Sequence, residues 1–243
     1  MFATKESDLV PVYYEVCDSS EVTSGTYTEE DIEVTYYYKY KDFDYTVEYY
    51  YDGVKDDTKT EVKQETYSNV VDSYTDKNIV GYTLEKVEGL PLTMSEVVEN
   101  NVIKVFYVKD NFDYTVEYYY QGVKDDSKTV RGSELFGLEV TTYEDKVIDG
   151  YKFERVENNP LMITEEPTNN VMKVYYVKDN FGYTVEYYYE GTRNDEQTVT
   201  NIAEFESEVV DYEDKVIDGY RFDRVENNPL TITSNAEKKV MKV

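Results

Sequence analysis

The chain has 243 residues, and its 25 Lys and Arg against 52 Asp and Glu give a formal charge of −27. A field of this sign repels phosphate backbones and anionic membrane surfaces, which argues against binding to nucleic acid. With one cysteine and no histidine, the chain cannot form an internal disulfide or build metal sites from imidazole or several thiolates. No apolar run is long enough to span a bilayer.

A fixed period organises the sequence. The motif YTVEYYY begins at Tyr45, Tyr114 and Tyr183, a spacing of 69 residues (114 − 45 and 183 − 114). Such a period predicts copies of one structural unit. We expect repeat 1 at residues 44–112, repeat 2 at 113–181 and repeat 3 at 182–243. Residues 1–43 would be the closing part of a preceding repeat or a divergent leading domain. The last residues start another closing strand, so we expect a fragment whose third repeat has a truncated closing strand.

Each repeat opens with strict alternation. In repeat 1, Tyr45, Val47 and Tyr49 fall on one face of the predicted strand, and Glu48 and Tyr50 fall on the other. This period of two is typical of a half-buried strand. An acidic or amide residue followed by glycine comes next in all three repeats, and it predicts a hairpin turn into a second strand.

The middle of each repeat has no clean period, so it predicts a turn-rich crossing or a short helix. A Gly-Tyr pair then starts another short strand, and a proline follows at a turn or sheet edge. The closing strand alternates again, with Ile103, Val105 and Tyr107 on one face and Lys104 and Phe106 on the other. The fold class expected is mainly β, with an α+β arrangement as the alternative if the crossing is helical.

The leading segment GTYTEEDIEVTYYYKYKD and the order of motifs in each repeat carry a resemblance. The opening YTVEYYYDG, the central GY and the closing VIKVFYV or VMKVYYV resemble the MucBP-type repeats of Gram-positive cell-surface proteins. The resemblance implies extracellular tandem domains with a ubiquitin-like or β-grasp fold, forming an elongated rod. It also implies a secreted or wall-anchored parent protein and a link to mucin or host-glycan adhesion.

A β-grasp sheet makes the register testable, because its opening and closing strands lie side by side and parallel. Glu48 would then neighbour Lys104, and Tyr50 would neighbour Phe106 on the same polar face. In repeat 2 the same pairs would be Glu117 with Lys173 and Tyr119 with Tyr175. Pairs of these kinds contribute roughly 0.2–1 kcal/mol each.

The candidate ligand-binding residues are aromatic side chains on the polar strand face. An aromatic ring with a polar tip suits a shallow, wet site for sugar rings, and repeating a weak site raises avidity. The alternative is that these rings only shield the sheet, since strand propensity alone favours tyrosine. The residues are Tyr50, Tyr119, Tyr188, Phe106 and Tyr175.

The acidic pairs and the recurrent lysines bear on two further chemistries. Calcium is the only metal that the acidic pairs Asp56-Asp57 and Asp125-Asp126 suggest, but the third copy reads Asn194-Asp195, so a solvated turn is preferred and no metal or other cofactor is expected. A Lys-Asn isopeptide bond would need Lys104 or Lys173 in an apolar pocket, and alternation puts both on the polar face.

The sequence therefore predicts a non-catalytic repeat region that acts in adhesion by weak multivalent binding to mucin or host glycans. It has no Gly-rich phosphate loop, and in so acidic a chain the presence of carboxylate pairs says almost nothing about glycosidase chemistry. One alternative is an inert stalk that displays a distal adhesive domain. Another is a pilus or lattice subunit that assembles through strand edges. The partner would be a host glycan, mucin or none, and the fragment itself would be monomeric.

Overall fold

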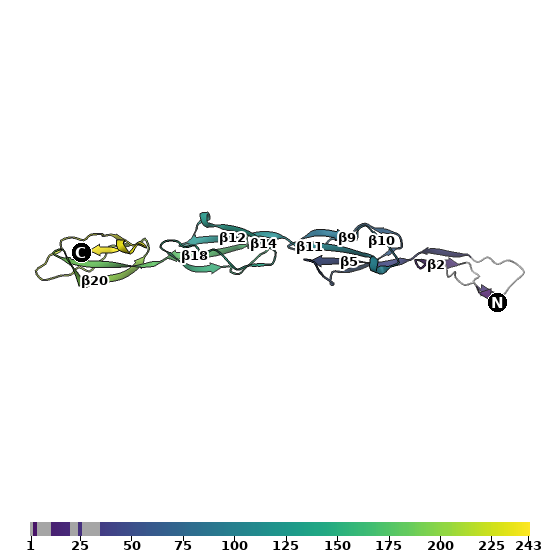
Figure 1. The fold of residues 1–243 in the computed structure, drawn as a ribbon, viewed down its shortest axis with the longest axis horizontal. Helices are drawn as coiled ribbons and strands as arrows, with labels where there is room; N and C mark the ends of the chain where they lie inside the picture. Colours follow the sequence, from purple (N-terminus) through teal and green to yellow (C-terminus); the bar gives the residue numbers. More distant parts are fainter. Residues whose placement is uncertain (1, 4–10, 20–23, 26–34) are drawn as a thin grey trace. The chain divides into compact units, whose positions relative to one another are not determined.

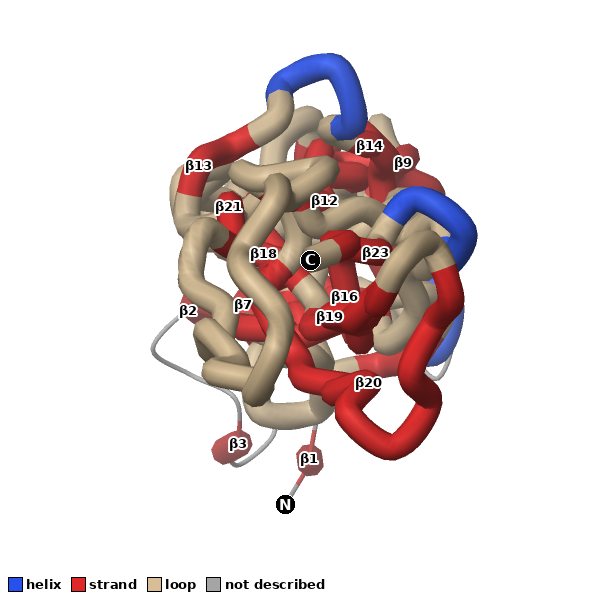
Figure 2. The backbone as a smooth tube through the Cα atoms, turned by 90° about the vertical axis from the view of Figure 1, so that its left-hand side faces the viewer, coloured by secondary structure: helices blue, strands red, loops and turns tan. Residues whose placement is uncertain are grey.

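The computed structural model describes residues 2–3, 11–19, 24–25 and 35–243. Strands dominate these residues, and the helical segments among them are short 3-10 turns (Figure 2). The turns are η1 (Val98–Asn100), η2 (Asp126–Lys128) and η3 (Ala236–Lys238). The described part of the chain is thus mainly β, and the crossing of each repeat contains no α-helix there.

The chain divides into two compact units, Met1–Asp110 and Asn111–Val243, and Figure 1 labels the main strands of both. The first holds the leading segment and repeat 1, and the second holds repeats 2 and 3. In the leading segment, β1 (Phe2–Ala3) pairs with β3 (Ser24–Gly25), and β2 (Tyr14–Ser19) pairs with β4 (Tyr36–Tyr40), both antiparallel. Much of the sequence that suggested a preceding repeat, residues 26–34, lies outside the described residues.

Repeat 1 is built on one five-stranded sheet. Its strand order is β6-β5-β11-β9, with β7 also paired to β5. A small separate sheet joins β8 to β10. The strands are β5 (Asp42–Tyr51), β6 (Val54–Lys55), β7 (Glu61–Thr66), β8 (Val70–Val71), β9 (Tyr82–Glu88), β10 (Leu92–Thr93) and β11 (Val102–Lys109).

The central pairing confirms the predicted register. Strands β5 and β11 run parallel, and Lys104 lies opposite Glu48 while Phe106 lies opposite Tyr50. The first hairpin is also as predicted, because Asp52 and Gly53 both have positive φ (49° and 78°) between paired Tyr51 and Val54. Two consecutive positive φ values are the signature of a type I′ turn, which a residue followed by glycine accommodates.

The core lies on one face of the sheet. Val47, Tyr49, Ile103 and Val105 are fully buried there, and Met94 packs against them. Residues 72–80 cross this face without regular secondary structure. The opposite face carries the polar side chains of the same strands, half-buried.

Tyrosine hydroxyls hold the crossing on the core. Tyr49 Oη donates to the carbonyl of Thr75 at 2.6 Å, and Tyr107 Oη donates to Asp76 at 2.5 Å. The Lys77 N–H donates back to Tyr107 Oη at 3.0 Å. These bonds satisfy a backbone that has no strand partner, which is why an aperiodic segment can lie over a packed core.

Repeats 2 and 3 repeat this plan. In repeat 2, β12 and β18 are parallel with Glu117 opposite Lys173 and Tyr119 opposite Tyr175, as predicted. Its strands are β12 (Asn111–Tyr120), β13 (Val123–Lys124), β14 (Val130–Leu135), β15 (Glu139–Val140), β16 (Tyr151–Glu157), β17 (Leu161–Met162) and β18 (Val171–Lys178).

Repeat 3 has a smaller sheet, β20-β19-β23. The Gly-Tyr pair at 219–220 does not start a strand there, and a single bridge joins Glu226 to Lys242. In repeat 2 the strand that starts at the Gly-Tyr pair is held by the eight residues of β18. The closing strand of repeat 3, β23, has three residues and offers a shorter pairing edge. The strands are β19 (Asn180–Tyr189), β20 (Thr192–Glu204), β21 (Glu208–Val209), β22 (Leu230–Thr231) and β23 (Val240–Lys242).

Candidate functional site

The polar face of repeat 1 carries a row of four side chains across four strands. Lys55 on β6 lies opposite Tyr50 on β5, which lies opposite Phe106 on β11, which lies opposite Lys86 on β9. The two rings stack with centroids 4.7 Å apart and planes 22° apart. Lys86 Nζ lies 4.7 Å from the Phe106 centroid. We call this cation–ring–ring–cation arrangement the aromatic row.

Repeat 2 has the same row with different side chains. Lys124, Tyr119, Tyr175 and Arg155 take the four places. The rings stack at 4.9 Å and 23°, and the Arg155 guanidinium carbon lies 3.9 Å from the Tyr175 centroid. A guanidinium over a ring face is a favourable cation–π contact.

In repeat 3 the row is partial. Arg193 lies opposite Tyr188, and Lys242 Nζ lies 5.8 Å from the Tyr188 centroid. No second ring lies opposite Tyr188 in the described strands, and this residue lines a cavity of about 770 Å³. In repeat 2 the second half of β18, with Tyr175, lies beside the equivalent stretch of the opening strand.

A charged row runs beside the aromatic row. Lys104 lies between Glu48 and Glu88 on the neighbouring strands, and Tyr50 Oη and Lys55 Nζ both donate to Glu48, at 2.7 and 2.8 Å. Burial alone would raise the pKa of Glu48, but the hydrogen bonds from Lys55 and Tyr50 outweigh it and lower that pKa. The carboxylate is therefore held charged.

The pKa of the tyrosine hydroxyl in the row shifts in the opposite direction, upward. In repeat 2 the hydrogen bond to Glu117, followed by burial, raises the pKa of Tyr119 to about 12. In repeat 3 the hydrogen bond from Tyr188 is the main reason that the pKa of Glu186 is lowered. At neutral pH each row thus presents a neutral phenol, a carboxylate and fixed cations.

The structure brings the five candidate residues onto the predicted face and changes how they could bind. Tyr50 stacks on Phe106 and Tyr119 stacks on Tyr175, while a cation covers the outer face of each closing-strand ring. A sugar in repeats 1 and 2 would therefore meet ring edges, hydroxyls and charged groups. Among the described strands, none places a second ring opposite Tyr188.

The cations of the row were not predicted. A basic residue recurs at the repeat period at each end of the row. Beside the opening-strand ring it is Lys55, Lys124 or Arg193, and at the other end of the row it is Lys86, Arg155 or Arg224. Their recurrence at the repeat period, with lysine and arginine exchanged but the charge kept, is the signal that could have found them.

The acidic pairs have local roles. Asp56 Oδ1 accepts from the backbone N–H and the hydroxyl of Thr58, and its other oxygen lies 3.2 Å from Lys59 Nζ. Asp125 makes the same contacts with Ser127. The described residues hold no cluster of three metal-ligating side chains, and Lys104 and Lys173 lie on the polar face beside carboxylates.

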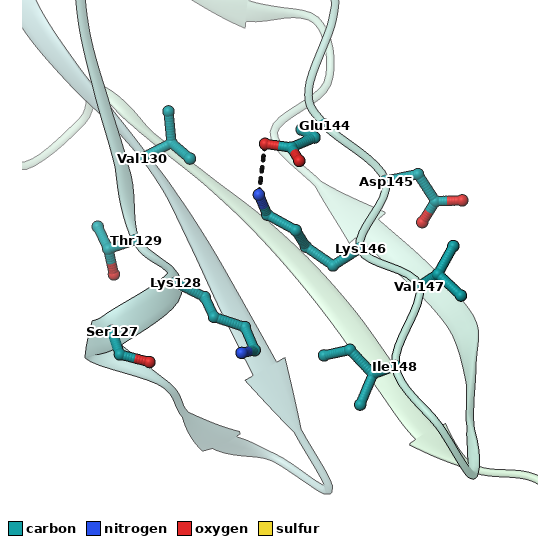
Figure 3. A pocket seen from close by; sticks show the side chains of 9 residues that line it. All are labelled: Ser127, Lys128, Thr129, Val130, Glu144, Asp145, Lys146, Val147 and Ile148. Atoms are coloured by element: carbon teal, nitrogen blue, oxygen red, sulfur yellow. Dashed lines mark ion pairs between the residues drawn. The ribbon is translucent and has the colours of Figure 1, made fainter.

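A second cavity, of about 440 Å³, lies in repeat 2 between the start of β14 and the crossing (Figure 3). Residues 127–130 line one side and residues 144–148 line the other. Lys146 is paired with Glu144, and Asp145 accepts from the Tyr176 hydroxyl. The polar groups on the crossing side are thus engaged, whereas the Thr129 hydroxyl on the other side is buried and has no hydrogen-bond partner among the described residues.

No protein-family model matches the chain, and no curated protein matches it. Among the described residues, no helix is long and apolar enough to cross a membrane. The aromatic row is therefore the feature from which a function can be argued.

Proposed function

We propose that this chain is a non-catalytic repeat region of a bacterial cell-surface protein, in which each repeat binds mucin or host glycans weakly through its aromatic row. The observation that carries the proposal is the recurrence of the row. In repeats 1 and 2 two rings lie between two cations, and in repeat 3 the ring at Tyr188 keeps its flanking Arg193. Conversion of lysine to arginine keeps the charge while the turn residues around it change.

The chemistry of the row suits carbohydrate. Tyrosine combines an apolar ring with a hydroxyl, and carboxylates and ammonium groups offer the acceptors and donors that sugar hydroxyls need. The row is half-buried and shallow, so a single site would be weak, with a dissociation constant on the order of 1 mM. Linked weak sites gain through effective concentration, which is the purpose a tandem arrangement would serve.

The proposed architecture follows the same resemblance. Parallel opening and closing strands at the sheet centre, a hairpin before the crossing and an antiparallel outer strand support a β-grasp-like domain in tandem copies. A helix is the usual cover of such a sheet, and here a tyrosine-bound extended crossing takes that place. An extracellular, wall-associated parent is part of the proposal.

A stalk is the second candidate, and one observation favours it. In repeats 1 and 2 the ring faces contact each other and the flanking cations, as they would if the row only stabilised the sheet. On that account the repeats would display a distal domain and bind nothing themselves.

The experiment is an array of mucin-type and other host glycans probed with the chain and two triple variants. One variant carries Tyr50→Ala, Tyr119→Ala and Tyr188→Ala, and the other carries phenylalanine at the same positions. Binding that the alanine variant loses and the phenylalanine variant largely keeps would support the row as the site. Equal binding by all three, with circular dichroism unchanged, would contradict it, and no binding at all would favour the stalk.

A further inference from the structure

The corner after β20 carries a ring that contacts the preceding repeat. Phe205 packs edge-on against Tyr151 of repeat 2, with centroids 6.0 Å apart and planes 66° apart, and against Phe181 at 6.0 Å. Gly150 lies directly beneath this ring. A Cβ atom on Gly150 would come within 2.4 Å of three Phe205 ring atoms, so only glycine allows the approach.

Backbone hydrogen bonds tie the same two repeats together. The Asp179 N–H donates to the Gly150 carbonyl at 2.8 Å, and the Phe205 N–H donates to the Asp179 carbonyl at 2.9 Å. These bonds form a relay from the Gly-Tyr end of repeat 2, through the junction residue, to the corner of repeat 3. A junction that is hydrogen-bonded on both sides has little freedom to pivot.

Side chains add two contacts around the ring. Lys178 Nζ lies 3.2 Å from Glu206 Oε2, and Ser234 Oγ donates to Asp149 Oδ2 at 2.7 Å. The corner is itself fixed, because the Glu206 N–H donates to the carbonyl of Ile232, which is fully buried in repeat 3. The backbone that carries the Phe205 ring is thus hydrogen-bonded to the core of its own repeat.

The first unit contains the same backbone relay, with Tyr13 in the place of Gly150. There the Lys41 N–H donates to the Tyr13 carbonyl and the Tyr67 N–H donates to the Lys41 carbonyl, both at 2.9 Å. Tyr67 stacks on Tyr13 with centroids 4.1 Å apart and planes 2° apart. Tyr67 and Phe205 occupy equivalent positions, two periods apart, and Lys41 and Asp179 do as well.

In repeat 3, no aromatic ring among the described residues packs over the glycine of the Gly-Tyr end. Gly219 is the equivalent of Gly150, and nothing lies within 4 Å of its added Cβ. Tyr220, the equivalent of Tyr151, is 52% exposed. Gly150 is buried, and the atoms nearest to its added Cβ belong to Phe205 of the neighbouring repeat.

We propose that the Gly-Tyr end of a repeat is a docking surface whose partner is the corner aromatic residue of the next repeat of the same kind, so that repeats 2 and 3 tumble as one body. This inference does not depend on what the repeats bind. In the proposed joint, Phe205 is the docking side chain and Gly150 leaves the space that it fills.

Residual dipolar couplings of backbone amides in the full chain test the joint. We expect one alignment tensor to fit the amides of repeats 2 and 3 in the unchanged chain. In Phe205→Ala, couplings within each repeat should still fit, but the two repeats should require different tensors. Gly150→Val, which places atoms where the ring lies, should give the same loss of a common tensor from the other side of the joint.

Phe222→Ala is the matched control, since Phe222 is a 54% exposed aromatic of repeat 3 that packs on Tyr212 within its own repeat. It should keep the common tensor. Separate tensors in the unchanged chain, or a common tensor retained in both joint variants, would overturn the proposal.

Discussion

The hydroxyl of Tyr118 provides the sharpest test of how the crossing is held. Tyr118 is fully buried, and its Oη donates to the Glu144 carbonyl at 2.7 Å across 26 residues of sequence. Tyr118→Phe keeps the ring and its packing, and it removes only this bond. The net loss for one hydrogen bond is about 0.5–1.5 kcal/mol, and it reaches about 3 kcal/mol if the carbonyl stays away from water.

Repeat 2 offers a matched control two residues away. Among the described residues the hydroxyl of Tyr120 is buried and has no hydrogen-bond partner. Tyr120→Phe therefore removes a desolvated group that makes no bond, and we expect the stability of repeat 2 to stay the same or rise. The two substitutions are chemically identical, so their difference isolates the Tyr118 bond.

Urea unfolding followed through assigned amide signals of repeat 2 measures the difference. A repeat of this size has an m value of about 1 kcal/mol per molar urea, so Tyr118→Phe should lower the midpoint by about 0.5–1.5 M. Equal midpoint shifts for the two variants would contradict this prediction, because the crossing would then not depend on the hydroxyl bond.

Two further predictions concern pH and a buried amide. Burial raises the pKa of Tyr49 to about 12 from its ordinary value near 10, so the neutral phenol favours the fold. Its contribution is complete below pH 10 and is lost between about pH 10 and 12, with a slope of up to ~1.4 kcal/mol per pH unit, which thermal melts across that range would show as a falling midpoint. Asn170 is fully buried and bridges backbone groups of Asp113 and Thr164, at 3.2 Å and 2.7–2.9 Å, so Asn170→Ala should destabilise repeat 2 by about 2–4 kcal/mol in the urea assay. Repeat 3 has Lys239 at this position, and Lys239→Asn should raise its unfolding midpoint, while an unchanged midpoint would show that the amide bridge contributes little.

The sheet could be predicted because burial of one face gives each strand an alternation of apolar and polar residues in the sequence. The alternation of Tyr45, Val47 and Tyr49 fixes which face is inside, and the matching alternation in the closing strand then fixes the register once the strands are taken as parallel. That parallel choice came from the family resemblance, and the pairing of Glu48 with Lys104 agrees with it.

The crossing could not be predicted in the same way. Its path is set by hydroxyls of tyrosines on other strands, and alternation reports only whether such a ring is inside. The flanking cations of the row were missed for a similar reason. Lys86 and Phe106 are 20 positions apart and meet only because β9 lies beside β11, a pairing that no local pattern encodes.

Amide chemical shifts would test whether the aromatic row binds carbohydrate, as proposed. The chain, labelled with nitrogen-15, would be titrated with an oligosaccharide released from mucin and selected on the array. We expect saturable shifts at the polar-face residues of β5, β11, β12, β18 and β19, with dissociation constants on the order of 1 mM in each repeat. Shifts confined to other surfaces, or none at about 20 mM ligand where such a site would be nearly full, would contradict it.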